Sequence, residues 1–137
     1  MNHDEFVGQV QHRAQLASRG DAETIIRVTL ETLHERMQPE AASHVAAQLP
    51  AEIGRSLRGQ GQFEHLTLQD FLRRVAVRED ATIEKAVFHV RCVLEVVEMA
   101  ISPGAFRKLE NQLPQDFRAA LLPSPARREM VHAGGNA

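Results

Sequence analysis

Hydrophobic residues recur at every third or fourth position along most of the chain, which is the spacing of one face of an α-helix. Residues 22–37 show this most clearly, with an apolar stripe of Ala22, Ile25, Ile26, Leu30, Leu33 and Met37. Residues 83–101 carry a comparable stripe and add apolar residues outside it, namely Val87, Phe88, Val96 and Met99. A helix that is apolar on several sides is usually buried on several sides. The pattern therefore predicts an all-α protein with residues 83–101 as its central helix.

Polar residues and prolines mark where the predicted helices begin. Ser18 is the expected N-cap of residues 22–37, since a hydroxyl oxygen accepts a hydrogen bond from a free N–H of the first turn. Thr82 precedes the second long stripe in the same way. Pro39 and Pro103 predict two further starts, because proline at the first helical position lacks only an N–H that has no partner there. With the shorter amphipathic segments, these signals predict about eight helices.

The tripeptide Gln48-Leu49-Pro50 returns as Gln112-Leu113-Pro114, sixty-four positions later. Other residues repeat in the same order: Phe6 with Phe71, Val10 with Val75, Arg13 with Arg78, Arg27 with Arg91, Glu31 with Glu95, and Pro39 with Pro103. A supersecondary unit of this size does not close a core alone, so two copies are expected to pack together. We interpret the chain as a tandem, pseudo-symmetric repeat of two four-helix units that share one core.

The expected organisation is a single helical domain at residues 1–122, followed by a flexible tail at 123–137. Repeat one covers about 4–58 and repeat two about 67–122, with an inter-repeat linker at 59–66 whose glycines favour a flexible joint. The expected core residues are Phe6, Val10, Ile26, Leu30, Leu33, Leu49, Phe71, Val75, Val90, Leu94, Val97, Phe106, Leu109, Leu113 and Phe117.

Each repeated tripeptide is predicted to form a corner between two helices. Leu49 and Leu113 lie at heptad spacing from earlier apolar residues and are expected on the inner face. The prolines that follow them disfavour a helical conformation at the leucine, so one helix ends there and a short one follows. Gln48 and Gln112 have two possible roles. They could bind a ligand, but an amide next to a helix end more simply bonds free backbone groups, which is the role we expect.

Two arginines and one histidine are the candidate binding residues. Arg27 and Arg91 occupy equivalent positions, and two guanidinium groups near a pseudo-twofold axis suit a carboxylate or phosphate. The alternative is an ordinary pair with a glutamate one turn on, or a bridge between the repeats. His89 stands where repeat one has Ile25, and a polar group in an apolar stripe needs a partner or a pocket. Cys92 is one turn from His89, but this pair without further ligands does not predict a metal site.

Charge and composition narrow the classes of partner. Sixteen basic and eighteen acidic residues give a net charge of -2, without the basic excess of a nucleic-acid-binding protein. No apolar run approaches the ~20 residues of a bilayer span. The first residues do not resemble a secretory signal, and a single cysteine fits a reducing compartment. We expect a cytoplasmic protein with no nucleic acid, no membrane, no metal and no cofactor.

The sequence resembles the bacterial family called domain of unknown function 2267 over about residues 4–122. The resemblance rests on Phe6 and Phe71 opening each unit, on the segment Leu68-Gln69-Asp70-Phe71-Leu72-Arg73-Arg74-Val75, and on the two Gln-Leu-Pro motifs. It implies a small all-helical protein of two similar halves, with no established activity, cofactor or catalytic residues.

The sequence contains no catalytic or nucleotide-binding motif, so we carry two hypotheses for its function. The first is a non-catalytic cytoplasmic interaction or regulatory protein, which binds an unknown protein partner or a second copy of itself. The alternative is a small-molecule-binding module with an apolar pocket between the repeats, where His89, Arg27 and Arg91 supply the polar groups. A closed junction between the halves favours the first hypothesis, and a cavity lined by these residues favours the second.

Overall fold

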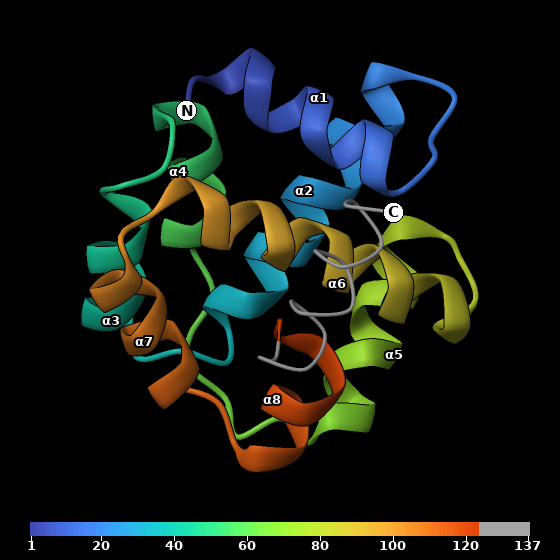
Figure 1. Cartoon of the computed structure of the whole chain (residues 1–137). Coiled ribbons are helices and arrows are strands. Elements are labelled where there is room, and N and C mark those ends of the chain that lie inside the picture. The colour runs from blue at the N-terminus through green and yellow to red at the C-terminus, as the bar shows by residue number, and fades with distance from the viewer. Residues whose placement is uncertain (124–137) are drawn as a thin grey trace, which may run out of the picture.

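The computed structural model describes residues 1–123, and these form eight α-helices without a strand (Figure 1). The helices are α1 (His3–Arg13), α2 (Arg19–His34), α3 (Pro39–Ala46), α4 (Ala51–Arg58), α5 (Leu68–Glu79), α6 (Ile83–Ala100), α7 (Pro103–Asn111) and α8 (Gln115–Leu121). The all-α prediction is confirmed, and the predicted central helix corresponds to α6. The tail expected at 123–137 lies, apart from Pro123, outside the described residues.

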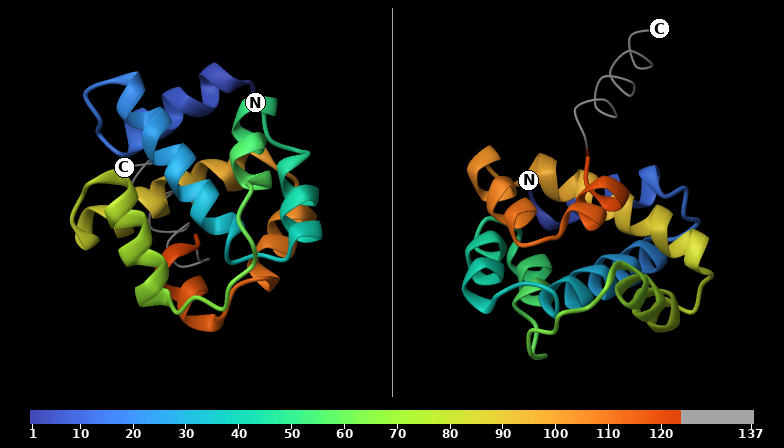
Figure 2. Two further views of the ribbon diagram at one scale, coloured as in Figure 1. Left: turned by 180° about the vertical axis from the view of Figure 1, so that it is seen from behind. Right: turned by 90° about the horizontal axis from the view of Figure 1, so that it is seen from below.

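The two longest helices, α2 and α6, pack against each other in the middle of the molecule (Figures 1 and 2). Helix α1 precedes α2 in the chain and contacts both α2 and α6, while α5 precedes α6 and contacts both α6 and α2. Helices α3 and α7 pack together, α4 lies against α2 and α3, and α8 lies against α6. Because α1 and α5 each reach the long helix of the other half of the chain, the two halves form one body.

Side-chain caps begin five of these helices. The capping residues, each accepting a hydrogen bond from an N–H of the first turn, are Asn2, Ser18, Thr67, Thr82 and Ser102. Pro39 and Pro103 are the first residues of α3 and α7, as their position in the sequence predicted. The helix starts are therefore fixed locally by residue type, since each cap bonds an N–H that has no partner within its own helix.

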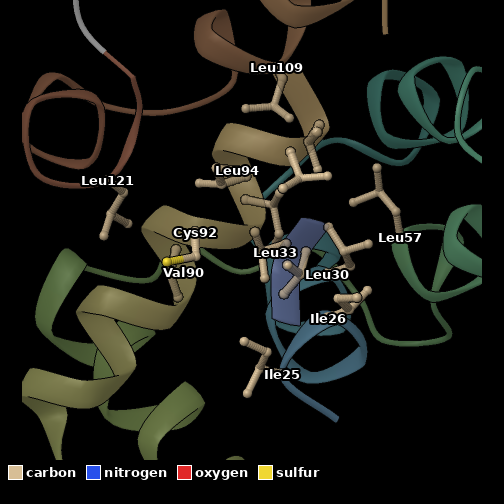
Figure 3. Close-up of a cluster of buried hydrophobic side chains, with 14 of the residues drawn as sticks. Ile25, Ile26, Leu30, Leu33, Leu57, Val90, Cys92, Leu94, Leu109 and Leu121 are labelled. Atoms are coloured by element: carbon tan, nitrogen blue, oxygen red, sulfur yellow. The ribbon is translucent and has the colours of Figure 1, made fainter. Parts of the chain in front are cut away.

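One hydrophobic core extends over both halves of the chain. Figure 3 shows part of it, with Ile26 and Leu30 of α2 and Val90 and Leu94 of α6 among the clustered side chains. Every residue that the sequence places in the core is buried. This confirms the apolar stripes of the two long helices as the surfaces that meet.

The prediction that α6 is buried on several sides is correct for Val96 and wrong for two other residues. Phe88 is 44% exposed and Met99 is 49% exposed, whereas Val96 is fully buried. Phe88, Cys92 and Met99 lie on one side of α6 by helical spacing. Helix α1 packs on α6, and Cys92 is buried while Phe88 and Met99 stay partly exposed. The apolar residues outside the main stripe therefore include exposed surface.

Gln48 and Gln112 bond backbone groups across the molecule. Oε1 of Gln48 accepts a hydrogen bond from the N–H of Ser102 at 2.8 Å, and Oε1 of Gln112 accepts one from the N–H of Gln38 at 2.9 Å. Ser102 and Gln38 immediately precede α7 and α3. Each glutamine therefore follows one of these two helices and bonds the residue before the other.

Candidate functional site

A large open hollow of about 910 Å³ lies between α2, α4, α5 and the segment 59–61. The left view of Figure 2 shows the course of these elements. We call it the α2 groove. Its charged lining residues are Arg27, Glu31, Glu35, Glu52, Arg55, Arg58 and Arg78. Val28 is the only residue with an apolar side chain in this lining, and the described residues place no aromatic ring there. Sites for small apolar ligands are enclosed and mostly apolar, so the α2 groove is a different kind of site.

Glu35, the residue after α2, joins this helix to α5. Its two carboxylate oxygens accept hydrogen bonds from the guanidinium groups of Arg74 and Arg78, each at 2.5 Å. Arg74 also donates to Glu64, and Arg78 also donates to the hydroxyl of Thr32. The Glu35 side chain is 11% exposed and largely shielded from water, whereas Arg74, Arg78 and Glu64 around it are partly exposed. It connects the end of α2, the linker and α5.

The pKa shifts of Glu35 and Arg74 both favour the charged form of the side chain. Burial raises the pKa of Glu35, because a buried carboxylate loses hydration. Hydrogen bonds from Arg78 and Arg74, together with their positive charges, outweigh burial and bring the pKa below its ordinary value. Hydrogen bonds to Glu64 and Glu35 raise the pKa of the Arg74 guanidinium. The result is a fixed set of ion pairs at one side of the α2 groove.

His34 holds the segment that borders the α2 groove. Its Nδ1 lies 2.9 Å from the carbonyl oxygen of Leu57, and its Nε2 lies 2.7 Å from the carbonyl oxygen of Gly61. Carbonyl oxygens only accept, so a ring with one proton donates to one of them and the imidazolium donates to both. Gly59 lies against the ring with a φ of +50°, and a Cβ there would be 2.6 Å from two ring atoms. The ring and the glycine therefore fit each other closely.

Arg36 and the backbone of Glu35 hold the rest of the linker. The Arg36 Nε donates to the carbonyl oxygen of Leu66, and its guanidinium lies 5.6 Å from the Phe63 ring centre and 5.5 Å from that of Phe117. The carbonyl oxygen of Glu35 accepts a hydrogen bond from the linker backbone at 2.7 Å. A cation above aromatic faces adds attraction to these bonds. The linker, expected as a flexible joint, is thus bonded to the end of α2 at three places.

Arg27 and Arg91 make different contacts despite their equivalent positions in sequence. Arg27 lines the α2 groove and pairs at 3.7 Å with Glu31, one turn further along α2. Arg91 instead donates from Nε to the carbonyl oxygen of Ala120 in α8, at 2.7 Å. The ordinary pair considered for both arginines therefore forms only at Arg27, and the two guanidinium groups do not meet as a clamp.

His89 forms a buried pair with Glu79 between α5 and α6. Its Nδ1 lies 2.8 Å from Oε1 of Glu79, and the Glu79 side chain is only 2% exposed. Oε2 of Glu79 has no hydrogen-bond partner among the described residues. This contact supplies the partner that a histidine in an apolar stripe requires. His89 shares no described contact or hollow with Arg27 or Arg91.

A smaller hollow of about 410 Å³ lies between α1 and α6. Arg13 of α1 bonds Glu95 of α6 at 3.1 Å and also contacts Sδ of Met99 at 3.2 Å. Phe88 lines this hollow and is partly exposed. Burial, followed by the negative charge of Glu95, raises the pKa of the Cys92 thiol to about 11, so the thiol stays protonated and unreactive at neutral pH.

The part of the chain that the structure describes carries neither a metal-binding cluster nor a membrane-spanning helix. Residues 1–123 contain no group of three or more His, Cys, Asp or Glu side chains placed to hold a metal ion. No helix within the same range is long and apolar enough to cross a membrane. The polar contacts of His34 and His89 in this range are with protein oxygens.

The polar cluster at the end of α2 was missed by sequence reasoning. His34, Glu35 and Arg36 are consecutive and look like an ordinary exposed helix end, yet all three are buried. One signal was available, because Met37 continues the apolar stripe beyond them and is fully buried. Because Met37 is held in the core, the three polar residues before it also lie close to the core, where another element can cover them. Here the linker and α5 cover them.

The fold defines a class: small all-α proteins in which two long helices pack together in one core. A family model described as "Uncharacterized conserved protein (DUF2267)" matches residues 3–120. The chain therefore belongs to the DUF2267 family, which confirms the resemblance seen in its sequence. No curated protein matches the chain.

Proposed function

We propose that the protein is a non-catalytic interaction or regulatory protein that binds a protein partner, or a second copy of itself, through its outer surface. The observation that carries this proposal is the closed junction between α2 and α6. Side chains from both helices belong to one continuous buried core, whereas the large hollow is open and charged. Protein partners are recognised by complementary charge and by polar groups at the edge of a contact surface.

The alternative is a small-molecule-binding module, and it has less support. It requires an apolar pocket between the halves with His89, Arg27 and Arg91 as convergent polar groups. His89 is engaged by a buried glutamate, and Arg91 by a carbonyl oxygen of α8. Only Arg27 lines the α2 groove, which is itself polar.

We also propose that the chain is a tandem repeat acting in the bacterial cytoplasm, with about 4–58 and 67–122 as its units. Each half carries four helices, of which the second is the longest. Helices α1 and α5 each contact the long helix of the other half. The reciprocal bonds of Gln48 and Gln112 support the same relationship. Under this proposal the outer faces of α2 and α6 are two diverged versions of one surface.

Native mass spectrometry of the protein purified from its own host tests the first part of the proposal. The expected result is 15.3 kDa per subunit, alone or as a multiple, without a retained small molecule. A stoichiometric small-molecule adduct would support the alternative instead.

Photo-crosslinking in host cells tests whether the outer surface binds a protein partner or a second copy of the chain. A photoreactive residue replaces exposed Gln60 at the groove, and the matched control replaces exposed Gly104, where an added Cβ meets no neighbour within 4 Å. We expect the photoreactive residue at one of these surface positions to capture one defined protein or a second copy of the chain. If neither position nor a third one at Phe88 yields a crosslinked protein, the interaction proposal is wrong.

A further inference from the structure

We infer that the α2 groove binds an acidic segment of a partner protein through Arg55 and Arg58. The inference rests on the proposed function and specifies the chemistry of the partner. Both arginines belong to α4, both are exposed and both line the groove. They are one helical turn apart and so lie on neighbouring positions of one face. Among residues 1–123, no carboxylate lies within ion-pair distance of either guanidinium.

The other charges of the groove already have partners. Arg78 is bonded to Glu35, and Arg27 is paired with Glu31. Glu52 lies 3.2 Å from Nε2 of His3 in α1, a contact that is an ion pair when this histidine is protonated. Glu35 also receives Arg74 from outside the groove lining, and because Arg74 is shared with Glu64, these two arginines and two glutamates balance in charge. A ligand that enters the groove therefore meets two unmatched guanidinium groups against a background of satisfied pairs, and it must bring the negative charge itself.

The surroundings favour spaced carboxylates over a chain of phosphates. Single-stranded nucleic acids are held by stacking on aromatic side chains as well as by charge, and the α2 groove has no aromatic residue in its lining. Its glutamates would repel the uniform negative charge of a phosphate backbone, and the protein as a whole carries a net charge of -2. In a peptide, carboxylates alternate with neutral groups. Ser56 and Gln60 in the lining can hydrogen-bond those neutral parts.

Helix α4 presents the two arginines from a rigid base. Ile53 and Leu57 of α4 are buried in the core. Gly54 fits so closely against α3 that a Cβ there would lie 2.5 Å from the carbonyl oxygen of Ala46. The end of the helix is held by His34 through the Leu57 carbonyl. A rigid base lowers the entropy lost on binding, because only the side chains need to be ordered.

Fluorescence anisotropy with a defined probe tests the inference. The probe is a fluorescein-labelled peptide in which glutamates are separated by serines, and the reference peptide has glutamine in place of every glutamate. We expect saturable, salt-sensitive binding of the acidic probe and no binding of the reference. The double variant R55E/R58E should weaken probe binding at least about tenfold, since it replaces attraction by repulsion in the groove.

The matched control is K85E/R107E, which makes the same change in net charge on exposed residues of α6 and α7. This control should bind the probe like the wild type, and both variants should show wild-type circular dichroism and thermal unfolding. Equal weakening by the two variants, or absence of probe binding to the wild type, would overturn the inference. Equally tight binding of a single-stranded oligonucleotide would also overturn it, because the groove would then respond to any polyanion.

Crosslinking separates this inference from the proposed function on which it rests. The photoreactive residue at Gln60 is placed in the wild-type and R55E/R58E backgrounds, and crosslinking is followed in host cells. A partner captured equally in both backgrounds would refute the role of the two arginines while the proposed interaction function stands. If no protein is captured in any background or position, both proposals fail.

Discussion

The two sides of the molecule that are built on α2 and α6 each carry an arginine ion pair, but the two pairs differ in how far they are buried. On the α6 side, Arg13 of α1 pairs with Glu95, and both side chains are about one-third exposed. On the α2 side, Arg78 of α5 corresponds to Arg13 in the proposed repeat, but it pairs with the buried Glu35. In the same proposed alignment Glu35 corresponds to Met99, which the Arg13 guanidinium also contacts. The same position is therefore a buried carboxylate on the α2 side and a half-exposed methionine on the α6 side.

The difference follows from what covers each side. On the α2 side, the linker and α5 lie over the end of the long helix and shield its carboxylate from water. A shielded carboxylate needs charged partners, and two arginines supply them. On the α6 side, Met99 is left at the surface and Phe88 with it. The α2 side thus carries a charged groove, and the α6 side carries an apolar edge.

Where the two sides are alike, substitutions should have equal and large effects. Leu30 and Leu94 correspond in the proposed repeat, and both are buried in the shared core. Leu30→Ala and Leu94→Ala should each lower the free energy of unfolding by about 2–5 kcal/mol, through lost transfer energy and the cavity that remains. Urea unfolding followed by circular dichroism measures both. A cost below about 1 kcal/mol for either one would contradict a core shared between the halves.

Where the two sides differ, matched substitutions should change the free energy of unfolding by different amounts. Glu35→Gln removes the charge that Arg74 and Arg78 share, and it should cost about 1–3 kcal/mol, less than a fully buried pair because both arginines are partly exposed. The matched change Glu95→Gln removes an exposed pair and should cost less than about 1 kcal/mol. Equal costs in urea unfolding would show that burial of Glu35 does not distinguish the two sides.

The pH dependence of the Glu35 effect has a defined sign. Its pKa in the folded protein lies below the ordinary value of 4.5, so the folded state favours the charged carboxylate. This stabilisation is present above the pKa of the unfolded chain and is lost as pH falls through the lower, folded pKa. The stability difference between wild type and Glu35→Gln should therefore be constant near neutral pH and shrink below about pH 4.5. A difference that grows on acidification would contradict the assigned ion pairs.

The sequence predicted the parts of this fold that depend on local pattern. The stripes containing Leu30 and Leu94 identified the core, and the positions of Ser18 and Pro103 identified helix starts, because periodicity and capping act within a few residues. The partners of Glu35 lie on α5, 39 and 43 residues further along the chain. Such contacts depend on how helices cross, which residue types alone do not reveal. The burial of Glu79 was missed for the same reason.

The fit between the linker and α2 predicts an intermediate effect confined to the α2 side. Gly59→Ala should lower the free energy of unfolding by about 1–3 kcal/mol, since its Cβ would enter the His34 ring and φ is positive. The rate of amide hydrogen exchange should increase in residues 59–66, because their contacts with the end of α2 are weakened. The control is Gly104→Ala, where a Cβ has open space and the expected change is within about 0.5 kcal/mol.

The smallest effect comes from making the α6 side resemble the α2 side. Met99→Glu places a carboxylate where the sulfur now contacts the Arg13 guanidinium, as Glu35 meets Arg78 in the other half. Because Met99 is about half exposed, the new pair should add only about 0.2–1 kcal/mol of stability, and less at high salt. Met99→Gln is the control, since it has similar size without charge. If Met99→Glu is no more stable than Met99→Gln at low salt, Arg13 does not hold the position that Arg78 holds, and the correspondence between the two sides fails at this residue.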